Sequence, residues 1–271
     1  MFNSTEIGYI FKKDEIIALA AMLGNREIMG IDDEELLYKN DENELRKRWK
    51  RASKQLEEKG YVKLQNEEII VDSILAYLIN CCCKPNFFIK CIQKYSKEKK
   101  VDISVIVSQN MIVTIEPDRT DKDCVILTPI EDFDALALKI LDNLDFFQSE
   151  GDFNNVNIKF NKQQYYSFNS AVNLKNTQKI VNLLMLSGME DYNAEKLAES
   201  FIDKDNFITV SLTNILSEKA ELIDAMMVVA GEKIYYLISS HTNQDEIMKI
   251  RQISQEECKK LIQNFFLRLK G

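Results

Sequence analysis

The sequence predicts an α+β protein in which a quasi-two-fold duplicated, mostly antiparallel central β-sheet is flanked by helical bundles. Three observations lead to this fold class. The stretch 102–116 is typical of two strands around a tight turn, a similar hairpin returns about 122 residues later, and each hairpin is followed by a further strand and a capped helix. The repeat is too long for a solenoid. Joining two such halves removes unpaired strand edges, which favours one continuous sheet.

The first hairpin, 102–116, has the alternation expected of paired strands. Ile103 and Val105 alternate with Ser104, and the sequence Gln109-Asn110 supplies the turn, because asparagine tolerates the positive φ that tight hairpins need. Apolar residues occur on both faces of these strands. We therefore expect the hairpin inside a sheet that is covered on both sides.

Apolar spacing and the positions of glycine and proline define the other elements of the first half, about residues 5–146. The expected elements are a strand at 7–11, helices at 13–23, 32–38 and 41–59, small paired strands at 61–64 and 68–71, a helix at 71–82, and strands at 87–95 and 124–127. The residues expected to face the core are Leu45, Trp49, Ala52 and Leu56 in the third helix, and Ile74, Leu75, Leu78 and Cys82 in the fourth.

The pattern then repeats after a linker at 145–155, over residues of about 156–270. The expected elements are a strand at 158–160, two or three helices within 162–203, a strand at 207–213, a hairpin at 225–239, a strand at 247–251 and a closing helix from 255. Thr128–Glu131 and Ser254–Glu257 are interpreted as equivalent capping boxes, with Pro129 at the first helical position. The alternative is that an α+β protein repeats a hairpin by chance. We expect a single domain over residues 1–271.

Composition excludes several classes of protein. The chain of 271 residues is 45% hydrophobic, which is enough for a core, and its net charge of −8 disfavours binding to nucleic acid or to anionic membrane. No apolar run reaches the length of a membrane span, and the N-terminus does not resemble a signal peptide. The six scattered cysteines are typical of buried thiols in a reducing compartment, so a cytoplasmic location is expected.

Residues that could carry catalysis or hold a cofactor are scarce. His241, the one histidine, lies in a polar loop without a nucleophile motif nearby, and adjacent Cys81, Cys82 and Cys83 point in directions about 100° apart on a helix, which does not suit a tetrahedral metal site. The eight glycines form no phosphate-binding motif. We expect a protein that is not an enzyme and has no cofactor or metal.

A basic helix followed by a hairpin supports an alternative function. The basic residues are Arg46, Lys47, Arg48, Lys50, Arg51 and Lys54. With the small hairpin at 61–71, this segment resembles the end of a winged-helix DNA-binding domain. Trp49 and Leu56 are expected to turn one face of this helix to the core, and four glutamates dilute its charge. A solvated helix face is therefore the favoured interpretation.

The sequences EIIALAAMLG at 15–24, RASKQLEEKGYV at 51–62 and PNFFIKC at 85–91 resemble the EspG family, cytosolic proteins associated with type VII (ESX) secretion. The resemblance extends over nearly the whole chain, and its motifs are of the core type rather than catalytic. It implies a non-enzymatic chaperone with a quasi-symmetric sheet and helical bundles, which keeps a helical secretion substrate soluble until export.

The resemblance also suggests a partner and a binding surface. The resemblance implies a PE/PPE-like helical client. The lysine-, isoleucine- and asparagine-rich composition is typical of a low-GC genome, for which a WXG-type or LXG-type helical protein is the alternative client. The central sheet and the C-terminal helical part form the family's binding surface. The candidate contact residues here are Lys97, Glu98, Lys99, Lys100, Met226, Val228, Tyr235, Leu237, Phe265 and Leu269. Plain core burial is the alternative for the apolar ones.

Overall fold

The computed structural model describes the chain as two compact units that are each built from several segments. The residues described are 8–31, 42–65, 68–94, 100–109, 111–144, 146, 156–203, 207–215, 220–230, 235–240 and 248–270. Unit 1 comprises 1–89, 103–132 and 213–221, and unit 2 comprises 90–102, 133–212 and 222–271. The helix expected at 32–38 and, apart from Phe146, the linker expected at 145–155 lie outside the described residues.

The fold class is the one expected, a mixed α+β protein with a large antiparallel sheet. Ten strands are neighbours in the order β1-β7-β6-β5-β4-β9-β10-β11-β12-β8, and β2 and β3 form a separate two-stranded sheet. The order is symmetrical about its middle. At one end the first strand of the N-terminal half lies beside the last strand of that half, and at the other end β8 lies beside β12 in the same way.

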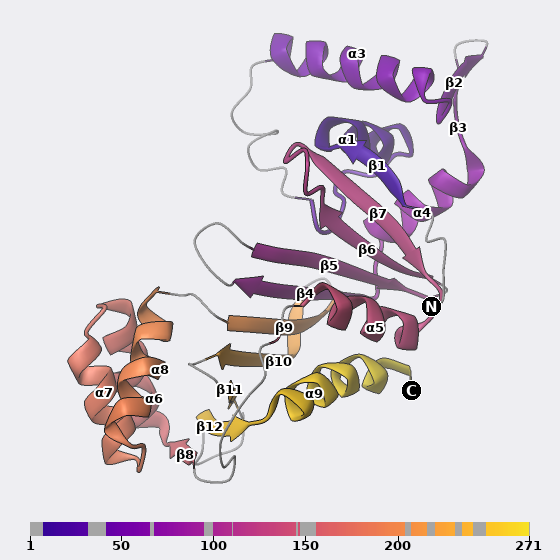
Figure 1. The fold of residues 1–271 in the computed structure, drawn as a ribbon. Coiled ribbons are helices and arrows are strands. Elements are labelled where there is room, and N and C mark those ends of the chain that lie inside the picture. Colours follow the sequence, from indigo (N-terminus) through magenta and orange to yellow (C-terminus); the bar gives the residue numbers. More distant parts are fainter. Residues whose placement is uncertain are drawn as a thin grey trace. The chain divides into compact units, whose positions relative to one another are not determined.

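The described residues of unit 1 form helices and the strands of the N-terminal half, as Figure 1 shows in indigo to magenta. Its elements are β1 (Tyr9–Lys12), α1 (Lys13–Met22), α3 (Glu42–Glu58), β2 (Val62–Gln65), β3 (Glu68–Val71), α4 (Ser73–Cys83), β4 (Phe87–Lys94), β5 (Lys100–Ser108), β6 (Met111–Pro117) and β7 (Cys124–Ile130). The last residues of β4 and the first of β5 belong to unit 2. The expected strand pair at 102–116 is confirmed as β5 and β6, with Val107 opposite Ile112.

The core of unit 1 forms where α1, α3 and α4 cover β1 and the strands beside it. Phe11, Leu19 and Leu56 are fully buried there. Gly24 and Gly60 end α1 and α3 with φ of +79° and +75°, a conformation that glycine adopts without steric cost. α1 and α3 pack against each other.

The start of α1 is stabilised by a carboxylate that the sequence pattern did not identify. Glu15 is 1% exposed, accepts a hydrogen bond from the backbone N–H of Lys12 at 2.8 Å, and pairs with the Lys59 ammonium at 2.6 Å. A buried carboxylate needs such partners, because an unpaired one costs several kcal/mol. Glu15 therefore ties the first turn of α1 to the end of α3.

Two expectations about β7 and α4 of unit 1 are wrong. Thr128 and Pro129 do not cap a helix, because both lie in β7, where Thr128 pairs with Thr114 and Pro129 with Val113 of β6. β7 pairs with β1 only over Cys124–Leu127. Pro129 lies beyond this stretch, where no hydrogen bond to β1 is needed and the missing backbone N–H of proline is tolerated. Ile74 is not a core residue, since it is 66% exposed at the start of α4.

Unit 2 holds the remaining helices, which lie on strands of the C-terminal half. Its elements are α5 (Phe133–Asn143), β8 (Asn157–Phe160), α6 (Lys162–Asn173), α7 (Thr177–Leu186), α8 (Asp191–Asp203), β9 (Phe207–Asn214), β10 (Glu221–Ala230), β11 (Tyr235–Ser240), β12 (Met248–Ile253), α9 (Gln255–Leu267) and the short 3₁₀ helix η1 (Arg268–Lys270). The ends of β9 and β10 nearest each other in sequence belong to unit 1.

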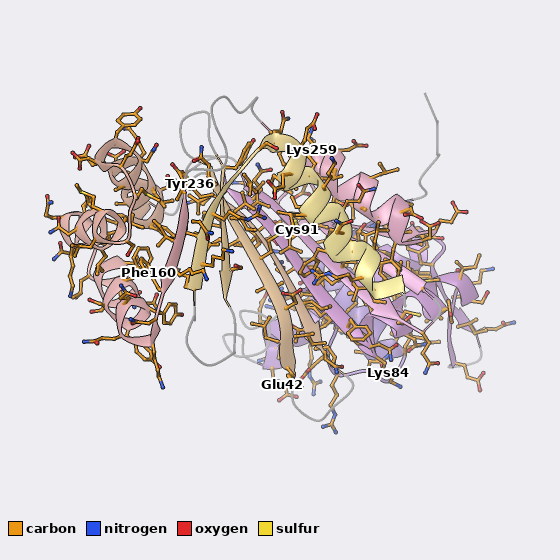
Figure 2. All side chains as sticks on the ribbon, turned by 90° about the horizontal axis from the view of Figure 1, so that it is seen from below. Glu42, Lys84, Cys91, Phe160, Tyr236 and Lys259 are labelled. Carbon is orange, nitrogen blue, oxygen red and sulfur yellow. The ribbon has the colours of Figure 1, made fainter. Side chains whose placement is uncertain are left out.

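The strands of unit 2 pack helices on both faces. Adjacent residues of a strand point to opposite faces. Tyr236 joins Phe160 and Phe168 in the core under the α6–α8 bundle, and Figure 2 shows Phe160 and Tyr236 beside that bundle. Tyr235 instead has its ring 6.4 Å from that of Phe146, and α9 packs against β11 and α5.

Helix starts in unit 2 agree in part with the expected caps. Ser254 caps α9 and accepts a hydrogen bond from the N–H of Glu257 at 3.1 Å, as expected, while the Glu257 carboxylate pairs with Arg251. A reciprocal capping box that the sequence pattern missed lies at α6. There Asn161 and Gln164 exchange bonds of 2.9 and 3.0 Å.

Candidate functional site

Burial disfavours the thiolate form of several cysteines. Burial raises the pKa of Cys83 to about 11 and that of Cys91 and Cys258 to about 12, and burial also raises the pKa of Cys82. A reactive cysteine needs the opposite shift, because the thiolate is the nucleophile. Most of the thiols are buried, as expected.

Other catalytic or metal-binding arrangements are equally scarce in the described part of the chain. It contains no group of three or more His, Cys, Asp or Glu that could hold a metal ion. His241 lies outside it. Within the same residues, no helix is both long enough and apolar enough to cross a lipid bilayer.

The predicted contact residues fall into two groups. Lys97, Glu98 and Lys99 lie outside the described residues, and Lys100 is the first residue of β5. The others lie in unit 2, where alternation places Met226 and Val228 of β10 on one face with Tyr235 and Leu237 of β11. This face carries the Tyr235–Phe146 contact.

The predicted contact residues on that face and in the C-terminal helix are either buried or half-buried. Val228, Tyr235 and Phe265 are at most 2% exposed and belong to the core of unit 2. Met226, Leu237 and Leu269 are half-buried. The Arg268 guanidinium lies over the Phe265 ring and pairs with Asp224 of β10 at 2.9 Å, which fastens the end of α9 to the hairpin. In the free chain, only the three half-buried residues offer a partner any surface.

A more exposed apolar surface lies at the turn between α7 and α8. Leu186 is 85% exposed, Met185 42% and Tyr192 58%. We call these three residues the α7–α8 apolar end. Gly188, with φ of +101°, closes α7 after Ser187 and brings the start of α8 back beside it. Three exposed apolar side chains thus lie at the adjoining ends of two helices.

The expectation of two or three helices within 162–203 did not identify the exposed residues at this turn. Ile180, Val181 and Leu184 are buried and form the inward face of the helix. The run Leu183-Leu184-Met185-Leu186 carried the signal, because four consecutive apolar residues cannot all point inward from a helix. Large exposed apolar patches usually mark interaction surfaces.

The turn lies close to the strands that hold the predicted residues. Burial raises the pKa of Tyr236 in β11 to about 12, and the Glu190 carboxylate in the turn adds to this rise. The side chain of Met189, in the same turn, is buried in the core that Tyr236 shares. The α7–α8 apolar end is thus carried by the same packed unit as β11.

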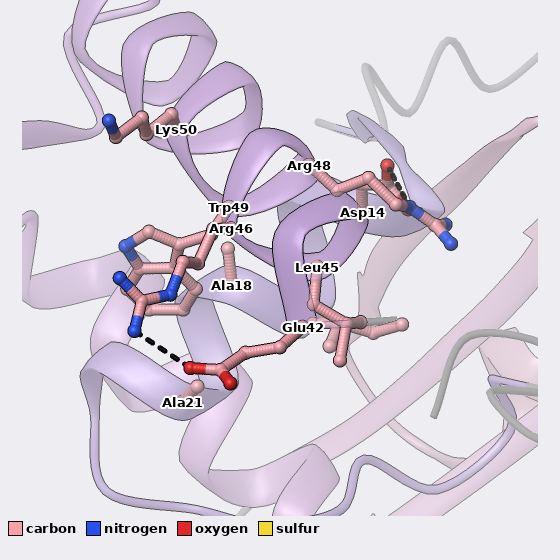
Figure 3. Close-up of a pocket in the computed structure, with 10 residues that line it drawn as sticks. Asp14, Ala18, Ala21, Glu42, Leu45, Arg46, Arg48, Trp49 and Lys50 are labelled. Atoms are coloured by element: carbon pink, nitrogen blue, oxygen red, sulfur yellow. Dashed lines mark hydrogen bonds and ion pairs between the residues drawn. The ribbon is translucent and has the colours of Figure 1, made fainter. Parts of the chain in front are cut away.

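Unit 1 contains a separate hollow between α1 and α3, which Figure 3 shows in close-up. It encloses about 560 Å³ and its apolar wall is formed by Ile17, Ala18, Ala21, Leu45 and Trp49. We call it the α1–α3 groove. Leu45 and Trp49 are 37% and 41% exposed, so the expectation that they face the core is wrong. Only Ala52 and Leu56 of the expected stripe are buried, because α3 lies on α1 mainly through its C-terminal half.

Many basic side chains of α3 are engaged with carboxylates. Arg48 pairs with Asp14 of α1, and both are largely buried. Arg46 pairs with Glu42 at 2.7 Å, and Lys54 lies 3.6 Å from Glu58. These pairs partly neutralise the surface that a DNA-binding helix would present, although the β2–β3 hairpin does follow α3 as the winged-helix alternative requires.

Comparison with known proteins gives a fold and no family. No protein-family model matches the sequence, and no curated protein matches it. Among solved structures, the chain is similar to the type VII secretion system chaperone EspG5 of Mycobacterium tuberculosis, solved in complex with the PE25–PPE41 dimer. The TM-score is 0.67, the likeness covers 96% of this chain and 94% of that chain, and the identity is 11%. At this identity the likeness shows the fold alone.

Proposed function

We propose that this protein is a cytoplasmic, non-enzymatic chaperone that binds a helical type VII secretion substrate and keeps it soluble for export. The α7–α8 apolar end is the observation that carries this function: Leu186, at 85% exposed, and its two neighbours form an apolar surface that no other described part of the chain covers. Helical clients with exposed apolar tips aggregate, and a complementary apolar surface prevents that by burying them.

The fold supports the same function. EspG5, which is similar in fold over 96% of this chain, is itself a chaperone in complex with a PE–PPE dimer. The client is then a PE/PPE-like, WXG-type or LXG-type protein. Half-buried Met226, Leu237 and Leu269 lie away from the α6–α8 bundle, with Met226 and Leu237 on the opposite face of the sheet, and are a separate set of candidate contacts.

Co-expression with small helical proteins encoded beside the gene tests this function. We expect one of them to form a complex that survives size-exclusion chromatography. The double substitution Leu186→Ser with Met185→Ser should weaken the complex by roughly tenfold or more, because apolar anchors dominate such interfaces. Absence of a complex with every such protein would contradict the proposed function.

Leu174→Ser is the matched control. Leu174 is 75% exposed and lies at the turn between α6 and α7, at the opposite end of α7 from Leu186. The control should bind like the unchanged protein. Equal losses in the control and in the double variant would mean that the chain binds clients without using the α7–α8 apolar end, and the site would be wrong while the function stands.

A further inference from the structure

The second apolar surface of the molecule, in unit 1, contains the single tryptophan of the chain. Trp49 lies across the α1–α3 groove from Ala18 and Ala21, as Figure 3 shows. Two alanines there leave room that larger side chains would fill, and Ala21 is exposed. An exposed tryptophan beside small residues is typical of the anchor of a protein interface, because tryptophan buries a large area when a partner binds.

The hollow continues on the other side of Trp49. A second one of about 290 Å³ lies between α3 and the β2–β3 sheet, and its apolar residues are Met22, Trp49, Val62 and Ile69. Trp49 and Lys50 line both hollows. Ile69 is 44% exposed, so the apolar surface extends from Leu45 along α3 to the hairpin. A surface of this length suits a helix laid along α3, whose own length is 17 residues.

Charge identifies the kind of helix. α3 carries six basic residues and four acidic ones, a net +2 in a chain of net charge −8. Arg46 and Lys54 are 72% and 76% exposed, and their ion pairs with neighbouring glutamates are of the exposed kind that contributes little. Both can exchange that glutamate for a partner's carboxylate. In the described part of the chain Lys50 has no ion-pair partner, and it stands at the rim of both hollows.

We propose that the α1–α3 groove, with the hollow beyond Trp49, is a docking site for an acidic amphipathic helix of a partner protein. The apolar face of that helix packs on Leu45, Trp49 and Ile69, and its acidic flank pairs with Lys50, Arg46 and Lys54. Nucleic acid fits less well, because a duplex presents phosphates and offers no apolar side chains to fill the hollows. The site lies in unit 1, whereas the proposed client surface lies in unit 2, so the two can be tested independently.

Trp49 makes the site directly observable, since the tryptophan emission of the protein comes from this residue alone. The probe is a synthetic peptide of about 17 residues without tryptophan, with leucines at i, i+3, i+4 and i+7 and glutamates on the flanks. We expect it to shift the emission to shorter wavelength with a Kd on the order of 10 μM. A peptide with the same leucines and lysine flanks should bind at least about tenfold more weakly.

Two neighbouring charge reversals make the test specific. Lys50→Glu removes the rim charge, whereas Arg51→Glu makes the same change at the next residue of α3, which is exposed but lines neither hollow. Lys50→Glu should raise the Kd of the acidic peptide by roughly fivefold, and Arg51→Glu should leave that Kd within about twofold of the value for the unchanged protein. Ala21→Phe, which fills the groove at an exposed position, should also weaken binding.

Three results would overturn the docking site. The first is an unchanged Trp49 emission at saturating acidic peptide. The second is an equal loss in Lys50→Glu and Arg51→Glu, which would indicate general attraction by the helix charge. The third is binding of duplex DNA at physiological salt that both reversals abolish, because this would assign α3 to nucleic acid. None of these results bears on client binding at the α7–α8 apolar end.

Discussion

Burial holds the thiol of Cys91 in its protonated form far into the alkaline range. Its pKa rises from 9.0 to about 12, first through burial, with the nearby Asp102 carboxylate adding to the rise and the Lys90 ammonium opposing it. The unfolded chain therefore loses this proton near pH 9, while the folded chain keeps it to about pH 12. Below pH 9 the two states bind the same number of protons here, so the thiol adds no pH dependence.

This difference predicts a loss of stability in alkali. As pH rises from about 9 to about 12, the thiolate of the unfolded chain favours unfolding by up to about 1.4 kcal/mol per pH unit. In urea unfolding, the stability difference between the unchanged protein and Cys91→Ala should be constant from pH 7 to 8 and should shrink by about 1 kcal/mol at pH 10. A constant difference up to pH 10 would contradict the raised pKa.

Helix α3 shows what sequence periodicity can identify and what it cannot. The spacing of Leu45, Trp49, Ala52 and Leu56 correctly predicts a helix. Periodicity shows which residues share a face of the helix. It does not show how much of that face α1 covers, because this depends on where α1 ends and on how the two helices cross. Ala52 and Leu56 meet the core, and Leu45 and Trp49 extend past it. The α1–α3 groove was therefore invisible in the pattern that predicted the helix.

The two halves of α3 should respond differently to truncation. Leu56 is fully buried, so Leu56→Ala should lower the free energy of unfolding by about 2–5 kcal/mol. Trp49 is 41% exposed, and Trp49→Ala should cost less than about 1.5 kcal/mol although it removes more atoms. Urea unfolding followed by circular dichroism measures both. Equal losses would mean that Trp49 is a core residue after all.

Strand β7 shows a second limit of the sequence. The Thr-x-x-Glu pattern with a following proline is a good local signal for a helix start, and it misassigned Thr128 and Pro129. What decides their conformation is not local: Thr128 and Pro129 pair with Thr114 and Val113 of β6. The helix itself was correctly expected, but α5 begins at Phe133. Pairing between strands distant in sequence overrode the local signal.

At the scale of the molecule, the alternation of the strands was sufficient to predict a large antiparallel sheet with flanking helices. The duplication of the two halves stays a prediction, with which the symmetrical strand order of the sheet agrees. The starts of α1 and α6 support it too, because each follows the first strand of its half and each has a third residue, Glu15 or Gln164, that accepts a hydrogen bond from the backbone N–H before the helix.

The candidate site was less predictable than the fold. The apolar residues predicted from the hairpin and the last helix fall into two sets that sequence alone does not separate. Val228, Tyr235 and Phe265 belong to the core, while Met226, Leu237 and Leu269 keep some exposed surface. Leu186 was not chosen, because its exposure depends on how α6, α7 and α8 share their inward faces. Exposure of an apolar side chain is a property of the packed unit.

Solubility of a client provides the most direct test of the proposed chaperone function. A small helical secretion protein encoded beside the gene would be diluted from denaturant alone, with an equimolar amount of this protein, and with the Leu186→Ser, Met185→Ser variant, while light scattering is recorded. We predict aggregation of the client alone, a clear solution with the unchanged protein, and aggregation again with the variant. Equal scattering with and without the unchanged protein, for every such client, would contradict the chaperone function.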